Sequence, residues 1–342
     1  MTQRPRVDGP PARRSLPLRH SAAALRAGES RRNQRSIAVA LAANLVVAVA
    51  KLVAGLTTGS AALLAEAGHS AADSINELLL GLSLRRGGVP ADDLHPFGHG
   101  GARFLWAFVA AISSFLIGGC LSVALAVREL LSGSAVERYL VGWVVLAVAF
   151  AADGVSLLQS LAQTRREAAL WEESPARFLR TTSDPTLRAI VVEDSAALIG
   201  LVIAAAGLLL HRFAGIANAD AIAALLIGLL LAATAFGLAR PLADLLIGRS
   251  MLPARLERVY VILERSPSID EIVSLKAVYG APQEVIVAAK VHPAPGRTAD
   301  ELATAFDGID HELRAELPEI AEVFIDLTSH RARSDDEPAQ RP

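Results

Sequence analysis

The segment Ala61–Arg86 has the sequence AALLAEAGHSAADSINELLLGLSLRR, and the interpretation of the whole chain depends on it. As a helix it is long and apolar enough to cross a bilayer, since a span needs about 20 mostly apolar residues. It nevertheless carries Glu66, His69, Asp73, Asn76 and Glu77. Ionisable groups at membrane depth are costly and mark an ion or substrate path more often than ordinary packing. The segment therefore predicts an ion-handling site inside the membrane.

Within this segment, His69 and Asp73 are four residues apart, which places them one turn apart on the same helix face. Glu66 and Asn76 extend that face by three residues at either end. An imidazole and a carboxylate at this spacing can ligate one ion, and zinc accepts N and O donors at roughly 2.0–2.2 Å. The alternative is a polar pair that hydrogen-bonds to neighbouring helices. In a spanning helix we favour the metal site.

The composition supports a membrane protein with room for a soluble domain. Of 342 residues, 52% are apolar and 20% charged, and the mean hydropathy is +0.40. A single cysteine, Cys120, excludes an intrachain disulfide framework and a zinc–thiolate cluster. No P-loop motif is present, so ATP-driven transport is not indicated.

Residues 1–35 carry nine Arg, one Asp and one Glu. We interpret them as a flexible basic tail. An Arg-rich targeting peptide is the alternative interpretation. Apolar segments long enough to span a membrane follow. There are six: Ser36–Thr57, Ala61–Leu84, Phe104–Val127, Tyr139–Leu161, Thr186–Leu210 and Ala219–Ala239. Arginines concentrate in the tail, in the second and fourth connections and after the sixth segment, which by the positive-inside rule predicts both termini in the cytoplasm.

Beyond Met251 the pattern changes to that of a small soluble domain. Helical and strand periods alternate in the order α-β-β-α-β: Pro253–Arg265, Ile269–Tyr279, Glu284–His292, Thr298–Leu317 and Val323–Leu327. Gly280-Ala281-Pro282 is the expected turn of a hairpin between the two strands. The predicted fold class is an all-α six-helix transmembrane bundle (36–250) followed by a small cytoplasmic α+β domain (251–328), with a disordered tail at 329–342.

Two further groups of residues could bind metal. Glu193 and Asp194 are neighbours in the fifth segment, and Asp194 is the best source of a ligand from a second helix; a pair at the water interface is the alternative. The connection after the second segment holds Asp92, His95 and His99, whose glycine-rich loop could fold around an ion or form a hydrogen-bonded cap.

Other polar residues carry weaker hypotheses. Asn44 in the first segment and Asp153 in the fourth must each find a partner, and Asp153 could line the path or relay a proton. Three histidines of the C-terminal region are interpreted as scattered surface residues: His292, His311 and His330.

Several motifs resemble those of the cation diffusion facilitators, a family of transporters for zinc and related divalent metals. They are GSAALLAEAGHSAAD (59–73), HPFGHG (95–100), DAIAALLIGLLL (220–231) and the α-β-β-α-β region, in the order of the family. EDSAALIG (193–200) resembles the zinc-transporter-nine-like branch. Six spans with both ends in the cytoplasm are also typical of this family.

The resemblance implies that His69, Asp73 and Asp194 ligate the transported ion. Asp92, His95 and His99 match a second metal site in the loop. The family usually has His or Asp four residues before the fifth-span Asp, whereas this chain has Ile190, so Glu193, Asn76 or water would complete the site. The last strand lacks the His-containing pattern by which relatives bind metal there, so no metal site is predicted in the C-terminal domain.

The resulting hypothesis is proton-coupled export of Zn²⁺ by alternating access, from a homodimer in a bacterial inner membrane. Its partners are membrane lipid, the metal ion and protons; an enzymatic or nucleic-acid-binding role is not expected. Mn²⁺, Co²⁺, Cd²⁺ and Fe²⁺ remain alternatives to zinc, while hard ligands disfavour Cu(I). The alternatives are a non-transporting membrane scaffold with a degenerate site, suggested by Ile190, and an intramembrane metalloenzyme, for which no general base is recognisable.

Overall fold

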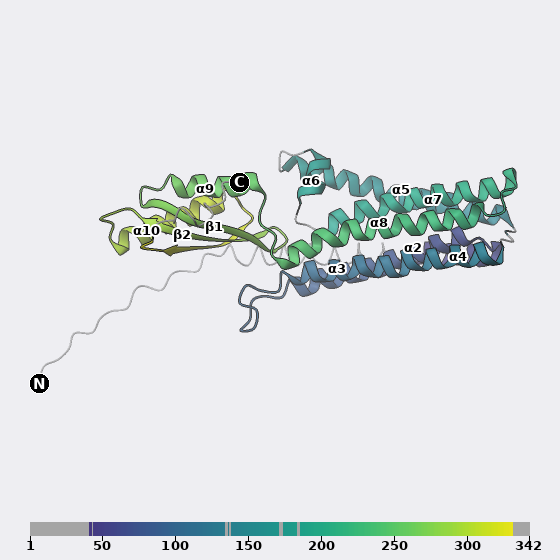
Figure 1. Ribbon diagram of the computed structural model, residues 1–342, viewed down its shortest axis with the longest axis horizontal. Helices are drawn as coiled ribbons and strands as arrows, with labels where there is room; N and C mark the ends of the chain where they lie inside the picture. Colours follow the sequence, from purple (N-terminus) through teal and green to yellow (C-terminus); the bar gives the residue numbers. More distant parts are fainter. Residues whose placement is uncertain are drawn as a thin grey trace, which may run out of the picture.

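The computed structural model describes residues 41–42, 44–133, 136, 138–170, 174–182 and 185–330. The predicted tail at 1–35 lies outside this range, as do residues 331–342 of the C-terminal tail. The molecule is elongated, with a bundle of long helices at one end and an α/β domain at the other (Figure 1).

The helices of the bundle follow the predicted segments but extend beyond most of them. The described elements are a helix at Asn44–Thr58, α2 (Ala61–Gly87), α3 (Ala102–Ser114), the π-helical turn η1 (Phe115–Cys120), α4 (Leu121–Ser132), α5 (Tyr139–Leu170), α6 (Pro175–Thr181), α7 (Pro185–Ala214) and α8 (Ala219–Ile247). The short helix α6 was not predicted. The third predicted segment is α3, η1 and α4 in continuous succession, so a π-helical turn interrupts it.

By length and composition, four described helices can cross a membrane: Ala102–Ser132, Tyr139–Ala169, Thr186–Ala214 and Ala219–Ile247. The described part of the first helix is shorter, and α2 carries Glu66, Asp73 and Glu77. The structure is thus a helical membrane domain with four long apolar helices, and spanning by all six remains a prediction.

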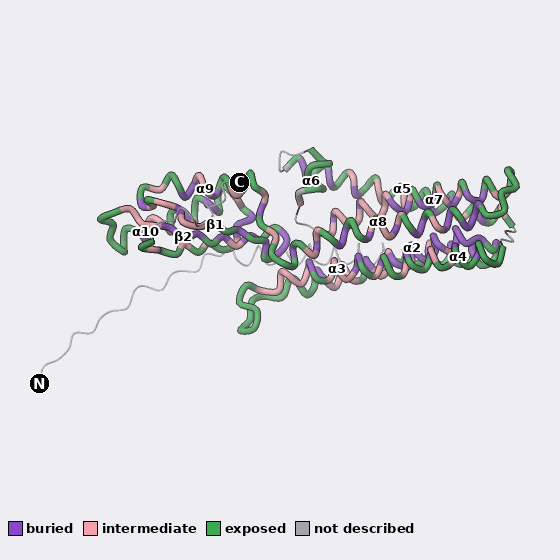
Figure 2. Tube along the Cα trace, in the orientation of Figure 1, coloured by how far each residue is buried: buried purple, intermediate pink, exposed green. Residues whose placement is uncertain are grey.

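The outer surface of the bundle is apolar, as a lipid-facing surface must be. Large apolar side chains are exposed on several helices, among them Val46, Val148, Leu158, Val202 and Phe236. Figure 2 shows exposed positions recurring along the outward side of the bundle helices. Such extensive exposed apolar surface is rare on soluble monomers and marks contact with lipid or another apolar partner.

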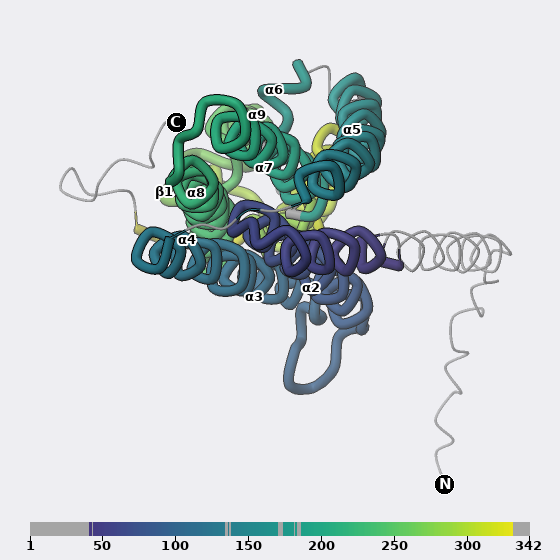
Figure 3. Tube along the Cα trace, turned by 90° about the vertical axis from the view of Figure 1, so that its right-hand side faces the viewer, coloured from purple at the N-terminus to yellow at the C-terminus, as the bar shows by residue number. Residues whose placement is uncertain are grey.

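Small residues allow close packing between helices, which lie side by side when viewed along the bundle (Figure 3). A Cβ at Gly228 of α8 would lie 3.0 Å from the backbone nitrogen of Val123 and 3.1 Å from the carbonyl oxygen of Gly119. The backbones of α8 and the η1–α4 region therefore approach to a distance that a larger residue would prevent.

Two buried acids hold the first turn of α2, at the end of the bundle away from the α/β domain. Asp220 of α8 accepts hydrogen bonds from the Ser60 hydroxyl at 2.7 Å and the Ala62 amide at 3.2 Å. Glu129 of α4 accepts one from the Ala61 amide at 3.1 Å. These carboxylates satisfy backbone donors that the start of any helix leaves unpaired, and they complement its dipole.

The C-terminal domain has the predicted order of elements. It consists of α9 (Pro253–Glu264), β1 (Ile269–Ala281), β2 (Glu284–Pro293), α10 (Ala299–Glu316) and β3 (Ile320–Leu327). The sheet has the order β1-β2-β3, with β1 and β2 antiparallel and β2 and β3 parallel. Thr298 and Glu301 form the capping box at the start of α10.

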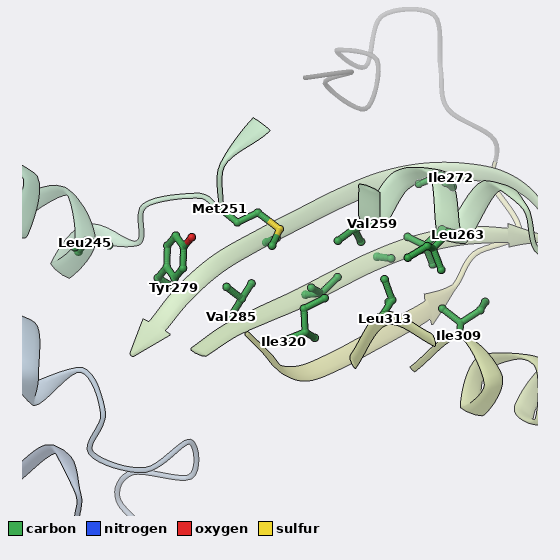
Figure 4. Close-up of a cluster of buried hydrophobic side chains, with 14 of the residues drawn as sticks. Leu245, Met251, Val259, Leu263, Ile272, Tyr279, Val285, Ile309, Leu313 and Ile320 are labelled. Carbon is green, nitrogen blue, oxygen red and sulfur yellow. The ribbon is translucent and has the colours of Figure 1, made fainter. Parts of the chain in front are cut away.

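One apolar core joins both helices to the sheet. Figure 4 shows Val259 and Leu263 of α9, Leu313 of α10 and Val285 of β2 directed into the same interior. The predicted hairpin is present, but the position of its turn was wrong. Gly280 and Ala281 still belong to β1, and the turn is Pro282-Gln283, where Gln283 adopts φ 60°.

The connections divide between the two ends of the bundle. The α2–α3 loop lies beside the α/β domain, where the Phe97 and Phe324 rings meet edge to face at 6.2 Å. The α5–α7 connection and the α8–α9 junction lie at this end too (Figure 1). The Arg-rich connections are thus on the side of the α/β domain.

Candidate functional site

His69 and Asp73 lie inside the bundle, as their helical spacing predicts. His69 is only 1% exposed, and its Nδ1 lies 3.5 Å from Asp73 Oδ1. Within the described part of the chain, neither ring nitrogen of His69 nor Asp73 Oδ1 has a hydrogen-bond partner. Buried polar atoms are normally paired. One ring nitrogen of His69 and Asp73 Oδ1 are therefore available to an ion, since a neutral imidazole offers a single lone pair.

Asp194 faces α5, where two serines hold it. Its Oδ2 accepts hydrogen bonds from Ser156 Oγ at 2.9 Å and Ser160 Oγ at 3.3 Å. Glu193 turns to α2 instead and accepts a hydrogen bond from Asn76 Nδ2 at 2.6 Å. Neighbouring residues of α7 thus point to different helices, as the helical rotation of about 100° per residue requires.

We refer to His69, Asp73, Glu193 and Asp194 as the buried cluster. Asp73 lies close enough to Glu193 and Asp194 to interact with both electrostatically. Among the described residues, however, no three members of the buried cluster offer ligand atoms that all lie within 4.8 Å of one another. Ser156, Ser160 and Asn76 hold the α7 carboxylates apart from the His69–Asp73 pair, and carboxylates without a cation between them repel.

A small cavity reaches the buried cluster from the end that carries the α/β domain. Side chains of α2, α3, α7 and α8 line it, with Glu193, Arg188 and Arg249 on its wall. Its volume of about 20 Å³ is room for roughly one water molecule. Toward the opposite end, Ala61, Ala62, Leu63 and Ala65 of α2 are at most 4% exposed, so tight packing closes that side.

The sequence analysis missed a buried lysine beside this cluster. Lys51 is fully buried, and its Nζ lies 3.0 Å from Glu66 Oε2, 2.9 Å from Ser70 Oγ and 3.7 Å from Asp153 Oδ2. The signal was present, because Lys51 is an ionisable residue inside an apolar run. Asp153, which the sequence suggested could line the ion path or relay a proton, is an ion-pair partner of Lys51.

Asp92, His95 and His99, which we call the loop cluster, form a group that could hold a metal ion. One ligand atom from each lies within 4.8 Å of the others. Asp92 Oδ1 accepts hydrogen bonds from the amides of His95 at 2.7 Å and Leu94 at 3.0 Å. The backbone amide of His95, with smaller contributions from its side chain and from Leu94, holds the pKa of Asp92 below its usual value. The carboxylate is therefore ionised and oriented at neutral pH.

A cleft of about 520 Å³ separates this loop from the α/β domain. Its walls include Pro96 and His99 on the loop and Glu284 and Glu322 on the domain. His95 is about half exposed and His99 less so. An ion could thus enter the loop cluster directly from solvent.

The remaining predicted residues have defined surroundings. Asn44 donates a hydrogen bond to Glu77 at 2.8 Å, and Ile190 of α7 is partly buried. His311 and His330 are exposed, as predicted. His292 differs from the prediction of an exposed surface residue. It is half-buried, and its Nδ1 lies 3.4 Å from Asp270 Oδ2.

Comparison with known proteins agrees with this architecture. A family profile described as the cation efflux transmembrane domain matches residues 37–247. The chain is 30% identical to the human proton-coupled zinc antiporter SLC30A9, mitochondrial, over 241 residues, which are 70% of this chain and 42% of that protein. It is 31% identical to metal tolerance protein C4 of Arabidopsis thaliana over 72% of this chain and 54% of that protein.

A third relative is the manganese efflux system protein MneP of Bacillus subtilis, 26% identical over 73% of this chain and 81% of that protein. The chain spans about two fifths of the length of the SLC30A9 proteins to which it is similar. Among solved structures, the nickel form of a MamM CTD variant is 17% identical, with a TM-score of 0.21, over 24% of this chain and 100% of that chain.

The family match covers more than half of the chain and includes every helix of the bundle. The chain belongs to the cation efflux, or cation diffusion facilitator, family, which is a family of multi-pass membrane transporters and not of enzymes.

Proposed function

We propose that the protein exports Zn²⁺ in exchange for protons by alternating access, with His69, Asp73 and Asp194 as the principal ligands. The observation that carries this proposal is the buried His69–Asp73 pair, whose free ligand atoms face carboxylates of α7. The family membership and the similarity to the human proton-coupled zinc antiporter SLC30A9 support it.

The chemistry of the ligands couples metal to protons. A metal ion requires neutral His69 and ionised carboxylates, so its binding releases protons. The ion would draw Asp194 away from Ser156 and Ser160 toward the His69–Asp73 pair. Protons that enter from the other side then weaken the site and promote release of the ion.

Glu193 is the candidate fourth ligand, in place of the residue that Ile190 does not supply. Asn76 holds its carboxylate with a 2.6 Å hydrogen bond. The cavity beside Glu193 is also lined by Leu245 and Arg249, which lie at the end of the bundle with the α/β domain. Glu193 is therefore the first acid of the buried cluster that an ion from this side would meet.

In this proposal, the conformation of the bundle corresponds to a state in which the buried cluster faces the α/β domain. The cavity reaches Glu193 from that side, while the Ala61–Ala65 turn is packed shut on the other. Arginines in the connections on the domain side support a cytoplasmic location for that side. An ion would enter there and leave after the opposite end opens.

The other regions have supporting roles in this proposal. All six helices of residues 36–250 span the membrane, and the domain at 251–328 serves as a dimerisation module in the cytoplasm. The loop cluster binds a second metal ion near the cleft between loop and domain. Zinc suits a site with one imidazole and carboxylates, and Mn²⁺ is the principal alternative, as the MneP relative illustrates.

The test is uptake of Zn²⁺ into proteoliposomes under a pH gradient. Wild-type protein should show gradient-driven uptake, and Asp194→Ala should abolish it. Asp244→Ala is the matched control, because Asp244 is an exposed acid of α8 outside the buried cluster. Full uptake by Asp194→Ala, with wild-type protein active, would refute the assigned ligand set.

A second candidate function is a membrane scaffold that binds no transported metal. Ile190 and the separation of the α7 carboxylates from His69 favour it. Calorimetric titration of purified protein with Zn²⁺ separates the two candidates. A scaffold would show no binding that depends on Asp73 or Asp194, whereas the transporter would.

A further inference from the structure

Lys51 is unusual in both sequence and position. The chain contains three lysines, Lys51, Lys276 and Lys290, and uses arginine for its other strong bases. Of the three, Lys51 alone lies in the helical bundle, where its side chain is fully buried. A buried ammonium is costly, and such groups in membrane proteins are functional more often than structural.

The surroundings of Lys51 form a compact ion network. Its Nζ binds Glu66 Oε2 at 3.0 Å and Ser70 Oγ at 2.9 Å, both on α2, and lies 3.7 Å from Asp153 of α5. Glu66 Oε1 has no hydrogen-bond partner within the described residues. A Cβ at Gly200 of α7 would lie 2.3 Å from this same oxygen, so the glycine leaves the space that the carboxylate fills.

This network adjoins the buried cluster. Glu66 and Ser70 flank His69 along α2, and Lys51 is close enough to Asp73 and His69 to act on both electrostatically. Its charge therefore acts on Asp73 and His69, the two residues of α2 that would receive a divalent cation.

We propose that Lys51 is a tethered cation that competes electrostatically with the transported metal and keeps the affinity of the buried cluster low enough for release. This inference rests on the proposed function. In the metal-free state, the ammonium offsets part of the negative charge of the acids around it. When the metal enters, the fixed positive charge opposes it at short range in a weakly screened interior.

Such a device suits a carrier. A site must bind an ion strongly enough to load it but weakly enough to let it leave. Several buried carboxylates without a fixed cation would hold a divalent ion too tightly. Lys51 limits that affinity without occupying a ligand position, and Glu66 in turn limits the effect of Lys51 by pairing with it.

The test is a charge cycle measured by Zn²⁺ titration of the full-length protein, with His95 and His99 replaced by alanine throughout so that the loop cluster contributes nothing. Lys51→Met should lower the Kd about tenfold and slow uptake into proteoliposomes, because the opposing charge is gone. Glu66→Gln should raise the Kd by a similar factor, because Lys51 loses its partner. The double variant should return to within about threefold of wild type, because the two charges cancel.

Two variants serve as controls. Lys51→Arg keeps the charge and should retain wild-type affinity. Lys290→Met removes an exposed lysine of the α/β domain, which pairs with Asp326, and should change nothing.

The direction of the change separates charge competition from a structural role. If Lys51 only supported the fold, Lys51→Met would weaken binding, and unchanged or weaker binding overturns the inference. If Lys51→Met does not fold, the Glu66→Gln variant and the double variant decide. A double variant that binds Zn²⁺ as weakly as Glu66→Gln overturns the inference. A double variant that binds Zn²⁺ about tenfold more tightly than Glu66→Gln supports it. Absence of binding by the wild type would instead refute the proposed function.

Discussion

The buried cluster and the loop cluster contain the same kinds of side chain in opposite environments. Asp92, His95 and His99 come from eight consecutive residues, are open to solvent, and each have a ligand atom within 4.8 Å of those of the other two. The buried cluster takes its residues from α2 and α7, and donors on α5 and α2 hold its acids. The loop cluster is thus arranged to bind an ion, whereas the buried cluster must rearrange to do so.

The difference matches two tasks. A site assembled by local backbone hydrogen bonds holds its ligands in one geometry, which favours a resident ion. A site whose ligands have alternative protein partners can exchange those partners for a metal and take them back afterwards, which favours an ion in transit. The comparison therefore predicts a strong dependence on each ligand in the buried cluster and a weaker one in the loop.

The largest effect is expected for Asp73→Asn. Asp73 is the acid paired with His69, and its loss removes both a ligand and a charge from the buried cluster. We expect Zn²⁺ affinity there to fall roughly 100-fold or more, since loss of an outer-shell partner alone typically costs 10–100-fold. Zinc titration in the His95→Ala/His99→Ala background measures it, with Asp244→Asn as control. A change below threefold would contradict the assignment.

Gly200→Ala tests whether the interior beside the buried cluster is as tightly packed as the structure indicates. The added methyl would lie 2.3 Å from Glu66 Oε1 and force this carboxylate away from its place. Overpacking of this kind costs about 1–3 kcal/mol. Thermal unfolding in detergent should show the loss, while Gly237→Ala, whose Cβ would meet nothing within 4 Å, should not.

Asp92→Asn should weaken zinc binding at the loop cluster about tenfold, and by the same factor at pH 8 and pH 5. The hydrogen bonds to Asp92 lower its pKa below its usual value near 4, so the carboxylate stays ionised over this range. The stabilisation it gives the loop is present above that usual value and is lost only as the pH falls through the lower folded pKa. Titrations in the Asp73→Asn background measure the ratio. A ratio that shrinks toward pH 5 would show that Asp92 takes up a proton in this range.

Phe97→Ala should have the smallest effect. The Phe97 ring contacts Phe324 of β3 edge to face, and such pairs contribute about 0.5–1.5 kcal/mol. Hydrogen exchange of the α2–α3 loop should accelerate several-fold, and zinc affinity of the loop cluster should fall about threefold, with the buried cluster unaffected. Unchanged exchange would mean that the loop does not depend on the domain for its order.

Periodicity predicted the helices and strands well, because each is defined by its own residues. The π-helical turn at Phe115–Cys120 and the exact position of the turn at Pro282-Gln283 were not predicted, since both depend on packing between elements. The π turn lies against α2: a Cβ at Gly118 would lie 3.9 Å from the Cα of His69.

The functional residues divide in the same way. Sequence spacing alone predicted that His69 lies near Asp73 and His95 near Asp92, because the members of each pair are close in the sequence. The partners of Asp194 and Glu66 were not predictable, because Ser156 and Lys51 come from helices whose relative rotation a single sequence does not specify. Lys51 could have been identified from the sequence as a charged residue within an apolar segment. Its partners could not have been identified in that way.

The acids that hold the start of α2 also determine how this helix can move. Asp220 and Glu129 fasten its first turn to α8 and α4, so α2 behaves as a lever with its pivot at Ser60. With a rise of 1.5 Å per residue, a tilt of about 10° would displace His69 by roughly 2 Å and Glu77 by roughly 4 Å. A modest rotation about this pivot is thus amplified toward the α/β domain, where Asn76 and Glu77 would travel farther than His69 and Asp73, the proposed ligands.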